Sequence, residues 1–273
     1  MIVQSERTPD GLLINALGSG QMLRILILGG TTEASALARL LAGDARFSPT
    51  LSLAGRTAAP TPQPVPMRVG GFGGAEGLTR WLAAGEIAAV IDATHPYAAR
   101  ISQNAAIACA GLGLPLGSII RPAWEERPGD LWTQTASAEA AASLLAGDAD
   151  PRRVFLSLGR LDLGAFAAAP QHDYLARTID QPDGLDLPPR IRFILQRGPF
   201  DASAEARLLA EESIAVIVSK NSGGAATYGK IDAACEARLP VIMIARPEKR
   251  HGAVLASPEA AIGWLADIAA HGR

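Results

Sequence analysis

The feature that most constrains the fold of this chain is a repeated alternation of short apolar runs with longer stretches rich in alanine and leucine. The apolar runs are continuous, and most end in a small or polar residue. This is typical of strands that are covered on both faces in a parallel sheet. We predict strands at Ile25–Leu28, Leu51–Ala54, Ala88–Ile91, Ile119–Ile120, Val154–Leu158, Ile191–Gln196, Ala215–Val218 and Val241–Ile244.

The stretches between these runs have the length and composition of helices. We predict helices at Glu33–Leu41, Gly77–Ala84, Ala98–Ala110, Ala138–Leu145, Ala202–Glu212 and Lys230–Ala237. Such an alternation predicts an α/β fold built from doubly wound units. A short internal repeat favours two similar halves, because one strand leads to Ile120-Arg121-Pro122 and another leads to Ala245-Arg246-Pro247.

We therefore predict two Rossmann-like domains whose parallel sheets face a central cleft. The first covers residues 22–127 and the second 128–273, and they join in the Pro/Gly-containing stretch Trp124–Trp132. Residues 1–21 lack the long apolar run of a signal peptide. We expect them to form a flexible extension, as a start site assigned too early would produce, and truncation at Met22 to leave folding and activity unchanged.

The composition excludes several classes of protein. With 25 Lys and Arg against 27 Asp and Glu, the net charge of −2 gives no support to nucleic-acid binding, which usually shows a basic domain. No apolar run approaches the ~18–20 residues of a transmembrane helix. Cys109 and Cys235 are too few for a disulfide framework, and with four histidines they do not form a zinc-site pattern. We expect a cytoplasmic enzyme; its oligomeric state stays open, and a monomer is compatible with the sequence.

The strongest local motif follows the first predicted strand and opens the first predicted helix. Its residues are Gly29, Gly30, Thr31, Thr32, Glu33 and Ala34. Glycines let the backbone turn tightly near a pyrophosphate, which the amides of the helix N-terminus then bind. Thr31 occupies the second glycine position of the dinucleotide fingerprint, and we expect Thr31 and Thr32 to offer hydroxyl donors to phosphate. A plain tight turn is the alternative.

The residues after the second predicted strand bear on the choice of cofactor. An NAD site usually has Asp or Glu here, which binds the ribose 2′-hydroxyl. This chain instead has Gly55, Arg56 and Thr57. A guanidinium makes bidentate contacts with phosphate, so Arg56 favours the 2′-phosphate of NADPH. The alternative is an arginine that is merely exposed to solvent.

Two polar segments follow later strands, at the edge where open α/β sheets bind ligands. In Asp92–Ala98, we expect Thr94 and His95 to line the cofactor pocket, and His95 or Tyr97 to donate a proton. In Ser219–Gly224, Lys220, Asn221 and Ser222 suit an anion or a carbonyl group. Structural turns are the alternative in both cases.

Arginines recur at the predicted strand ends, namely Arg121, Arg160, Arg197 and Arg246. We expect them to converge at the open edges of the sheets, where several charge-assisted pairs would hold a polycarboxylate substrate.

Four segments in this order resemble the precorrin-6A reductase family of cobalamin biosynthesis. They are Gly29–Ala34, Gly55–Thr57, Asp92–Ala98 and Ser219–Gly224. The resemblance covers about residues 22–250. It implies a cytoplasmic enzyme with two Rossmann-like domains that reduces precorrin-6A to precorrin-6B with NADPH and uses neither flavin nor metal.

The combined interpretation places NADPH in the first domain and a tetrapyrrole in the second. Substrate-binding candidates are Arg121, Lys220, Asn221, Ser222 and Arg246, and catalytic candidates are His95, Tyr97 and Lys220. Three alternatives stay open. They are a nucleotide-binding transferase, which would need an acidic residue where Arg56 stands, a non-catalytic binding protein, and a cobalt-precorrin-6A reductase that uses NADH.

Overall fold

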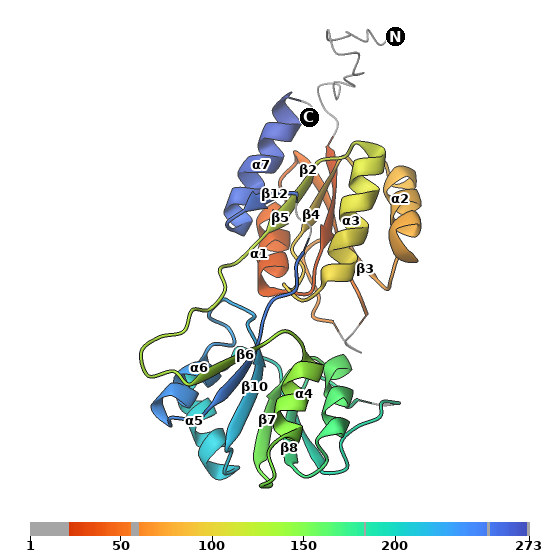
Figure 1. Ribbon diagram of the computed structural model, residues 1–273. Helices are drawn as coiled ribbons and strands as arrows, with labels where there is room; N and C mark the ends of the chain where they lie inside the picture. Colours follow the sequence, from red (N-terminus) through yellow and green to blue (C-terminus); the bar gives the residue numbers. More distant parts are fainter. Residues whose placement is uncertain (1–21, 56–59, 183, 250–251, 272–273) are drawn as a thin grey trace, which may run out of the picture. The chain divides into compact units, whose positions relative to one another are not determined.

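The computed structural model describes residues 22–55, 60–182, 184–249 and 252–271 (Figure 1). The chain divides into two compact units. The first runs to Arg121 and resumes at Glu248, and the second covers Pro122–Pro247. Each unit contains a six-stranded parallel sheet covered by helices, which confirms the predicted α/β class with two Rossmann-like domains. The predicted cleft between the domains stays a prediction, and the expected extension at 1–21 lies outside the described residues.

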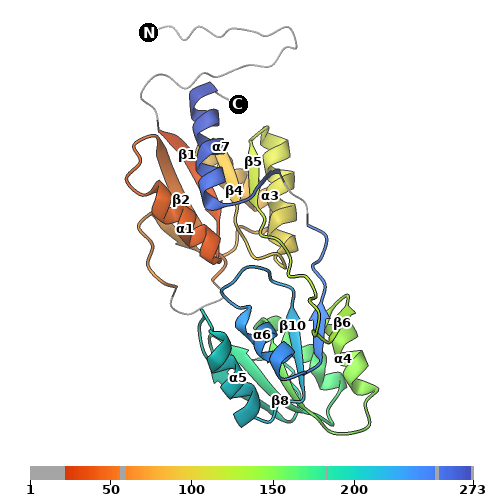
Figure 2. The ribbon, with the colours of Figure 1, turned by 90° about the vertical axis from the view of Figure 1, so that its left-hand side faces the viewer.

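The first sheet has the strand order β12-β5-β4-β1-β2-β3. Its strands are β1 (Leu23–Leu28), β2 (Phe47–Leu53), β3 (Met67–Val69), β4 (Ala89–Asp92), β5 (Leu116–Ile119) and β12 (Ala253–Leu255). Two helices cover each face, as Figure 1 and Figure 2 show. One face carries α1 (Thr32–Leu41) and α7 (Pro258–His271), and the other carries α2 (Gly74–Ala84) and α3 (Ala99–Leu112).

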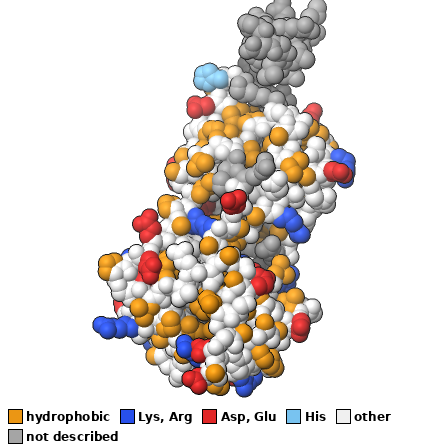
Figure 3. Space-filling view, viewed as in Figure 1, with side chains coloured by type: hydrophobic (Ala, Val, Ile, Leu, Met, Phe, Trp, Pro, Cys, Tyr) orange, Lys and Arg blue, Asp and Glu red, His pale blue; other side chains and the backbone are white. Residues whose placement is uncertain are grey.

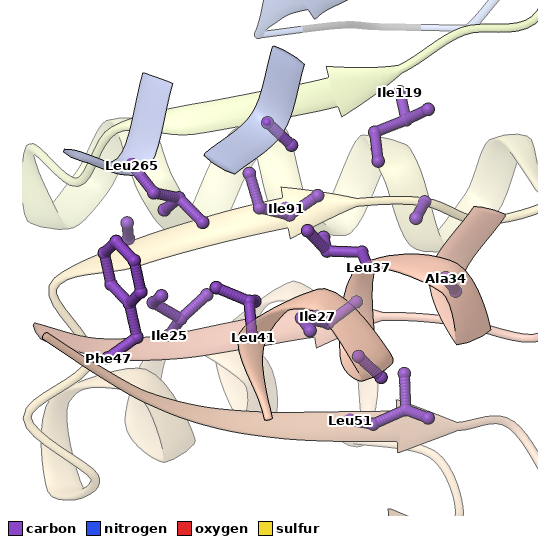
Figure 4. Close-up of a cluster of buried hydrophobic side chains, with 14 of the residues drawn as sticks. Ile25, Ile27, Ala34, Leu37, Leu41, Phe47, Leu51, Ile91, Ile119 and Leu265 are labelled. Atoms are coloured by element: carbon purple, nitrogen blue, oxygen red, sulfur yellow. The ribbon is translucent and has the colours of Figure 1, made fainter. Parts of the chain in front are cut away.

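Strand β1 lies in the middle of this unit because its side chains are apolar on both faces. Ile25 and Ile27 pack into the cluster formed with α1 and α7 (Figure 4). Leu26 and Leu28 point the opposite way and pack against α2 and α3. All four side chains are at most 2% exposed, and burial of each contributes about 1.5–3 kcal/mol. The central strand therefore holds both helical layers.

The second sheet has the strand order β6-β11-β10-β7-β8-β9. Its strands are β6 (Trp132–Thr135), β7 (Arg153–Ser157), β8 (Asp173–Thr178), β9 (Ile191–Leu195), β10 (Val216–Lys220) and β11 (Val241–Ile244). Helices α5 (Ala202–Glu211) and α6 (Gly229–Glu236) pack on one face. Helix α4 (Ala138–Ala146) and the 3-10 helix η1 (Arg160–Ala168) lie on the other (Figure 2).

The division of the chain differs from the predicted boundary in two places. Residues 122–127, predicted in the first domain, belong to the second unit. The segment from Glu248 onward, predicted in the second domain, belongs to the first unit, because β12 pairs with β5 and α7 packs on α1. Along the chain, the edge strand β12 of the first sheet thus follows β11 of the second sheet, and the edge strand β6 of the second sheet follows β5 of the first.

The surface drawn in Figure 3 has no large region of one charge, and the two cysteines form no disulfide. Acidic and basic side chains are scattered over the face in Figure 3 and do not gather into a patch of one sign. Among the helices that the structure describes, none has the length and apolar character to cross a membrane. Cys109 and Cys235 are both free, and burial raises the pKa of the Cys109 thiol to about 12.

Candidate active site

The turn after β1 is built by two glycines with different tasks. A Cβ on Gly29 would lie 2.5 Å from a methyl carbon of Leu51, so any side chain here would force the buried Leu51 to shift. Gly30 has a φ of +110°, which favours glycine, and a Cβ placed on it would meet nothing within 4 Å. The backbone at Gly30 is therefore open, directly before the N-terminus of α1. This geometry fits the approach of a dinucleotide pyrophosphate.

Thr31, which replaces a fingerprint glycine, is the N-cap of α1. Its hydroxyl oxygen accepts a hydrogen bond from the backbone N–H of Ala34 (3.1 Å). The same hydroxyl donates to the carbonyl oxygen of Ala93, which directly follows β4 (2.7 Å). A hydroxyl has one proton, and Thr31 donates its proton to Ala93 in this structure. The proton is therefore not donated to a phosphate, contrary to our prediction from the sequence. Thr31 instead ties the first turn to the segment after β4.

Glu33 and Arg121 form an ion pair at the N-terminus of α1. Nη1 of Arg121 lies 2.9 and 3.0 Å from the two carboxylate oxygens of Glu33. Burial alone would raise the pKa of Glu33, but hydrogen bonds from Arg121 and from its own backbone N–H outweigh burial and lower the pKa. Arg121, predicted to bind a substrate carboxylate, thus lies on a carboxylate of its own domain. Its charge also balances the carboxylate that follows the glycine turn.

The carboxyl end of β4 is held by a buried polar network. One oxygen of Asp92 accepts from the backbone N–H (3.0 Å) and the hydroxyl (2.6 Å) of Thr94, and the other accepts from the hydroxyl of Ser102 on α3 (2.5 Å). The ammonium of Lys249 lies 3.2 Å from Asp92 and donates to the Thr94 hydroxyl at 3.0 Å. Lys249 was not predicted from the sequence, because 154 residues separate it from His95 and no motif surrounds it.

His95 and Tyr97 follow this network and are half-buried. Nδ1 of His95 accepts a hydrogen bond from the backbone N–H of Tyr97 (3.3 Å), and the ring centroids lie 5.6 Å apart. An accepting Nδ1 places the proton of the neutral imidazole on Nε2. The first domain therefore brings together Gly29, Gly30, Thr31, Thr32, Glu33, Thr94, His95 and Tyr97 at the carboxyl edge of its sheet.

The segment expected to choose the cofactor is described only in part. Gly55 follows β2 with a φ of +73°, a backbone conformation that favours glycine. Arg56 and Thr57 lie outside the described residues.

In the second unit, the predicted residues at the end of β10 have partners of their own. The ammonium of Lys220 lies 2.6 Å from a carboxylate oxygen of Asp162 in η1. The side chain of Asn221 accepts from the backbone N–H of Trp124 (2.8 Å) and donates to its carbonyl oxygen (2.9 Å). Ser222 is half-buried beside them. These contacts fix the Ser219–Gly224 segment to its own domain.

The other predicted arginines of this unit do not share one environment. Arg246 donates to backbone carbonyl oxygens of Asn221 (2.9 Å), Pro122 (3.0 Å) and Ser222 (3.1 Å). Arg160 begins η1. Arg197 lines a cavity of about 310 Å³ next to α5, which Arg177 also lines. Arg246 is therefore a clamp on the loop in this structure. Within the described part of the chain, no cluster of His, Cys, Asp or Glu could hold a metal ion.

Comparison with known proteins gives a consistent result. The profile of the family "Precorrin-6x reductase CbiJ/CobK" matches residues 24–266. This chain belongs to the precorrin-6x reductase family. A precorrin-6A reductase of Rhodobacter capsulatus is 46% identical over 252 residues, which cover 92% of this chain and 99% of that protein. One from Sinorhizobium sp is 50% identical over 248 residues, 89% of this chain and 94% of that one.

A solved structure of a relative extends the comparison to the fold. The structure of "CobK precorrin-6A reductase" superimposes with a TM-score of 0.84 at 46% identity, over 90% of this chain and 97% of that one. A cobalt-precorrin-6A reductase of Salmonella typhimurium is more distant, at 30% identity over 232 residues, 82% of this chain and 87% of that one. As a member of the precorrin-6x reductases, the chain is an oxidoreductase, which confirms the predicted enzyme class and the resemblance.

Within this reductase, sequence reasoning missed the residues that hold the predicted ones in place. Lys249 and Asp162 contact the candidate residues Thr94 and Lys220 from distant segments, and Ser102 binds Asp92 from the helix that follows. A buried charge needs a partner, so Asp92 at the end of an apolar strand was a signal that a cation or several donors must lie nearby. The sequence could not say which of the 25 basic residues it would be.

Proposed function

We propose that this chain reduces precorrin-6A to precorrin-6B with NADPH, in the cytoplasm, as a step of cobalamin biosynthesis. The observation that carries the proposal is the open backbone at Gly30, at the N-terminus of α1, in a chain of a reductase family. The relatives named precorrin-6A reductase are 46–50% identical, whereas the named cobalt-precorrin-6A reductase is 30% identical. This difference favours the metal-free substrate over the cobalt form.

In the first domain, the chain's own groups bind and orient the cofactor, which supplies a hydride when bound. The N-terminus of α1 favours an anion, and we place the pyrophosphate there, beside the open backbone of Gly30. The Arg121 guanidinium keeps the Glu33 carboxylate from opposing that anion. Arg56 pairs with the 2′-phosphate, the contact that NADH lacks. Thr94 and His95 form the wall of the pocket at the end of β4.

A reduction of a conjugated ring also needs a proton and a place for the ring's carboxylates. His95 is our first choice of proton donor, because it lies in the turn after β4, beside the proposed cofactor pocket; Tyr97, Lys220 and water are the alternatives. Lys220 and Ser222 lie at the carboxyl edge of the second sheet and are proposed to bind substrate. Lys220 must share its charge with Asp162 to do so. The internal hydrogen bonds of Asn221 and Arg246 favour a role in shaping that loop.

The proposal is tested by titrating the purified protein with NADPH and NADH and following nicotinamide fluorescence. We expect NADPH to bind at least tenfold more tightly than NADH, and Arg56→Ala to abolish the difference. Arg39→Ala, in the last turn of α1, is the matched control and should leave both affinities unchanged. Turnover is then measured with precorrin-6A. Equal affinity for both nucleotides, or turnover only of cobalt-precorrin-6A, would refute the proposal in its present form.

A further inference from the structure

Lys249 is the first anchored side chain of the segment that returns to the first unit. The unit resumes at Glu248, and β12 and α7 follow. Although lysines usually stay in solvent, the Lys249 side chain is only 8% exposed, and its partner Asp92 is 1% exposed. The Lys249 side chain is therefore buried at the carboxyl end of β4, beside the candidate site.

The Lys249 ammonium makes two contacts there, and they have different consequences. The contact with Asp92, at 3.2 Å, balances a buried carboxylate. The bond to the Thr94 hydroxyl, at 3.0 Å, holds the residue directly before His95. Thr94 spends its own proton on Asp92 at 2.6 Å, so its oxygen is the acceptor for Lys249. Thr94 is thereby held on both sides.

No other charged side chain is described within bonding distance of Asp92, since its remaining donors are the backbone N–H of Thr94 and the hydroxyls of Thr94 and Ser102. Neutral donors alone are a weaker support for a buried carboxylate than a cation. Loss of the ammonium would thus loosen the turn from Asp92 to Ala98 at its first residue. Within the turn, the backbone N–H of Tyr97 donates to Nδ1 of His95 (3.3 Å), and the backbone N–H of Ala98 donates to the carbonyl oxygen of His95 (2.8 Å), so the residues after Thr94 are bonded to one another.

We infer that Lys249 is a positioning residue of the candidate active site, which sets the place of His95 through Thr94. The inference rests on the proposed function only where it extends to cofactor binding. The segment that completes the first sheet therefore also completes the site.

The test uses the imidazole ¹H–¹⁵N resonances of the full-length protein, which has four histidines. We expect Lys249→Met to shift or broaden the His95 signal, assigned with a His95→Gln variant. His172 is the internal control, because it is buried in the second unit and bonded to Leu145. Arg24→Met is the matched variant. It breaks an exposed ion pair with Glu86 in the same unit and should leave His95 unchanged.

A second variant separates positioning from simple charge balance. In Asp92→Asn/Lys249→Met both charges are gone, and the asparagine still accepts from Thr94, so the protein is expected to fold if the single variant does not. We expect His95 to stay displaced in it, because Thr94 still lacks the ammonium. A His95 signal at the native position in either variant would overturn the inference.

Cofactor binding supplies the second readout. At a temperature where circular dichroism shows the variant fully folded, we expect the NADPH Kd of Lys249→Met to rise at least fivefold, and Lys249→Arg to recover part of the loss. An unchanged Kd in folded Lys249→Met would overturn the extension to cofactor binding. Failure of the native protein to bind NADPH would instead contradict the proposed function, and the His95 signal would still decide the positioning role.

Discussion

Replacement of Thr31 by alanine removes two hydrogen bonds that depend on one hydroxyl. The first is the N-cap bond from Ala34 (3.1 Å), and loss of such a cap costs about 1 kcal/mol. The second is the bond to the carbonyl oxygen of Ala93 (2.7 Å), and loss of a bond that leaves a partly buried acceptor unpaired costs about 1–2 kcal/mol. We therefore expect Thr31→Ala to lower the free energy of unfolding of the first unit by about 2–3 kcal/mol.

The same unit offers a matched control. Ser257 caps α7, since its hydroxyl oxygen accepts from the backbone N–H of Ala260 (3.2 Å). Its other side-chain contact is with the exposed Glu259, which adds little. Ser257→Ala should therefore cost only the cap, about 1 kcal/mol. Thr31→Ser keeps both bonds and should stay within about 0.5 kcal/mol of the native protein.

Urea unfolding followed by circular dichroism measures these differences. If Thr31→Ala and Ser257→Ala cost the same within error, the bond to Ala93 contributes nothing and Thr31 is an ordinary cap. If Thr31→Ala costs clearly more, the hydroxyl joins the first turn to the end of β4. In that case the variant should also weaken NADPH binding, because the turn that carries Gly30 loses its anchor.

Three further predictions follow from individual contacts. Glu33→Gln should lower the free energy of unfolding by roughly 1 kcal/mol at pH 7. Because folding lowers the pKa of Glu33, this contribution exists above about pH 4.5 and is lost as the pH falls. Urea unfolding against pH measures it, and the Arg121→Met background should remove it. Burial lowers the Lys230 pKa to about 7, so the unfolded chain binds more protons between pH 7 and about 10; stability should rise with pH over that range, and the rise should vanish in Lys230→Met. Asn221→Ala removes the side-chain partner of the backbone N–H and carbonyl oxygen of Trp124, and should lower the free energy of unfolding of the second unit by about 2–3 kcal/mol in urea. An unchanged midpoint would show that the two bonds between Asn221 and Trp124 do not stabilise the unit.

The sequence patterns predicted buried strands such as β1, β4 and β11, and also the partly exposed edge strand β9. Strand β8, Asp173–Thr178, was missed because it begins and ends with polar residues and contains Arg177. That arginine is buried only because Glu205 on α5 binds it through two bonds of 2.9 and 2.7 Å. The short strands β3, β6 and β12 were missed because edge strands of three or four residues bury little apolar surface. Local patterns cannot reveal a partner that lies on another element.

The same limit applies to the candidate site. The glycine turn and the two polar segments follow β1, β4 and β10, as the sequence patterns predicted. That ligands bind at these strand ends stays a prediction. The partners of the side chains were not predicted. Thr31 was expected to face a phosphate and bonds Ala93, and Arg121 was expected to face a substrate and bonds Glu33. A motif predicts where backbone groups are available to a ligand. Which partner each side-chain donor binds depends on residues that are distant in the sequence.

The two halves of the internal repeat place an arginine at equivalent positions in the fold, but the two arginines make different contacts. Arg121-Pro122 follows β5 and Arg246-Pro247 follows β11, and both stand where the chain leaves its unit. Each arginine binds within the unit that it leaves, but the partners differ. Arg246 binds backbone carbonyl oxygens and shapes a loop, whereas Arg121 binds the carboxylate of Glu33, beside the turn proposed for the cofactor. A neutral replacement of Arg246 should therefore disturb the loop, while the same change at Arg121 takes the cation from the Glu33 carboxylate at the helix end proposed to bind an anion. The repeat predicts equivalent positions in the fold, and the partner of each arginine decides its chemistry.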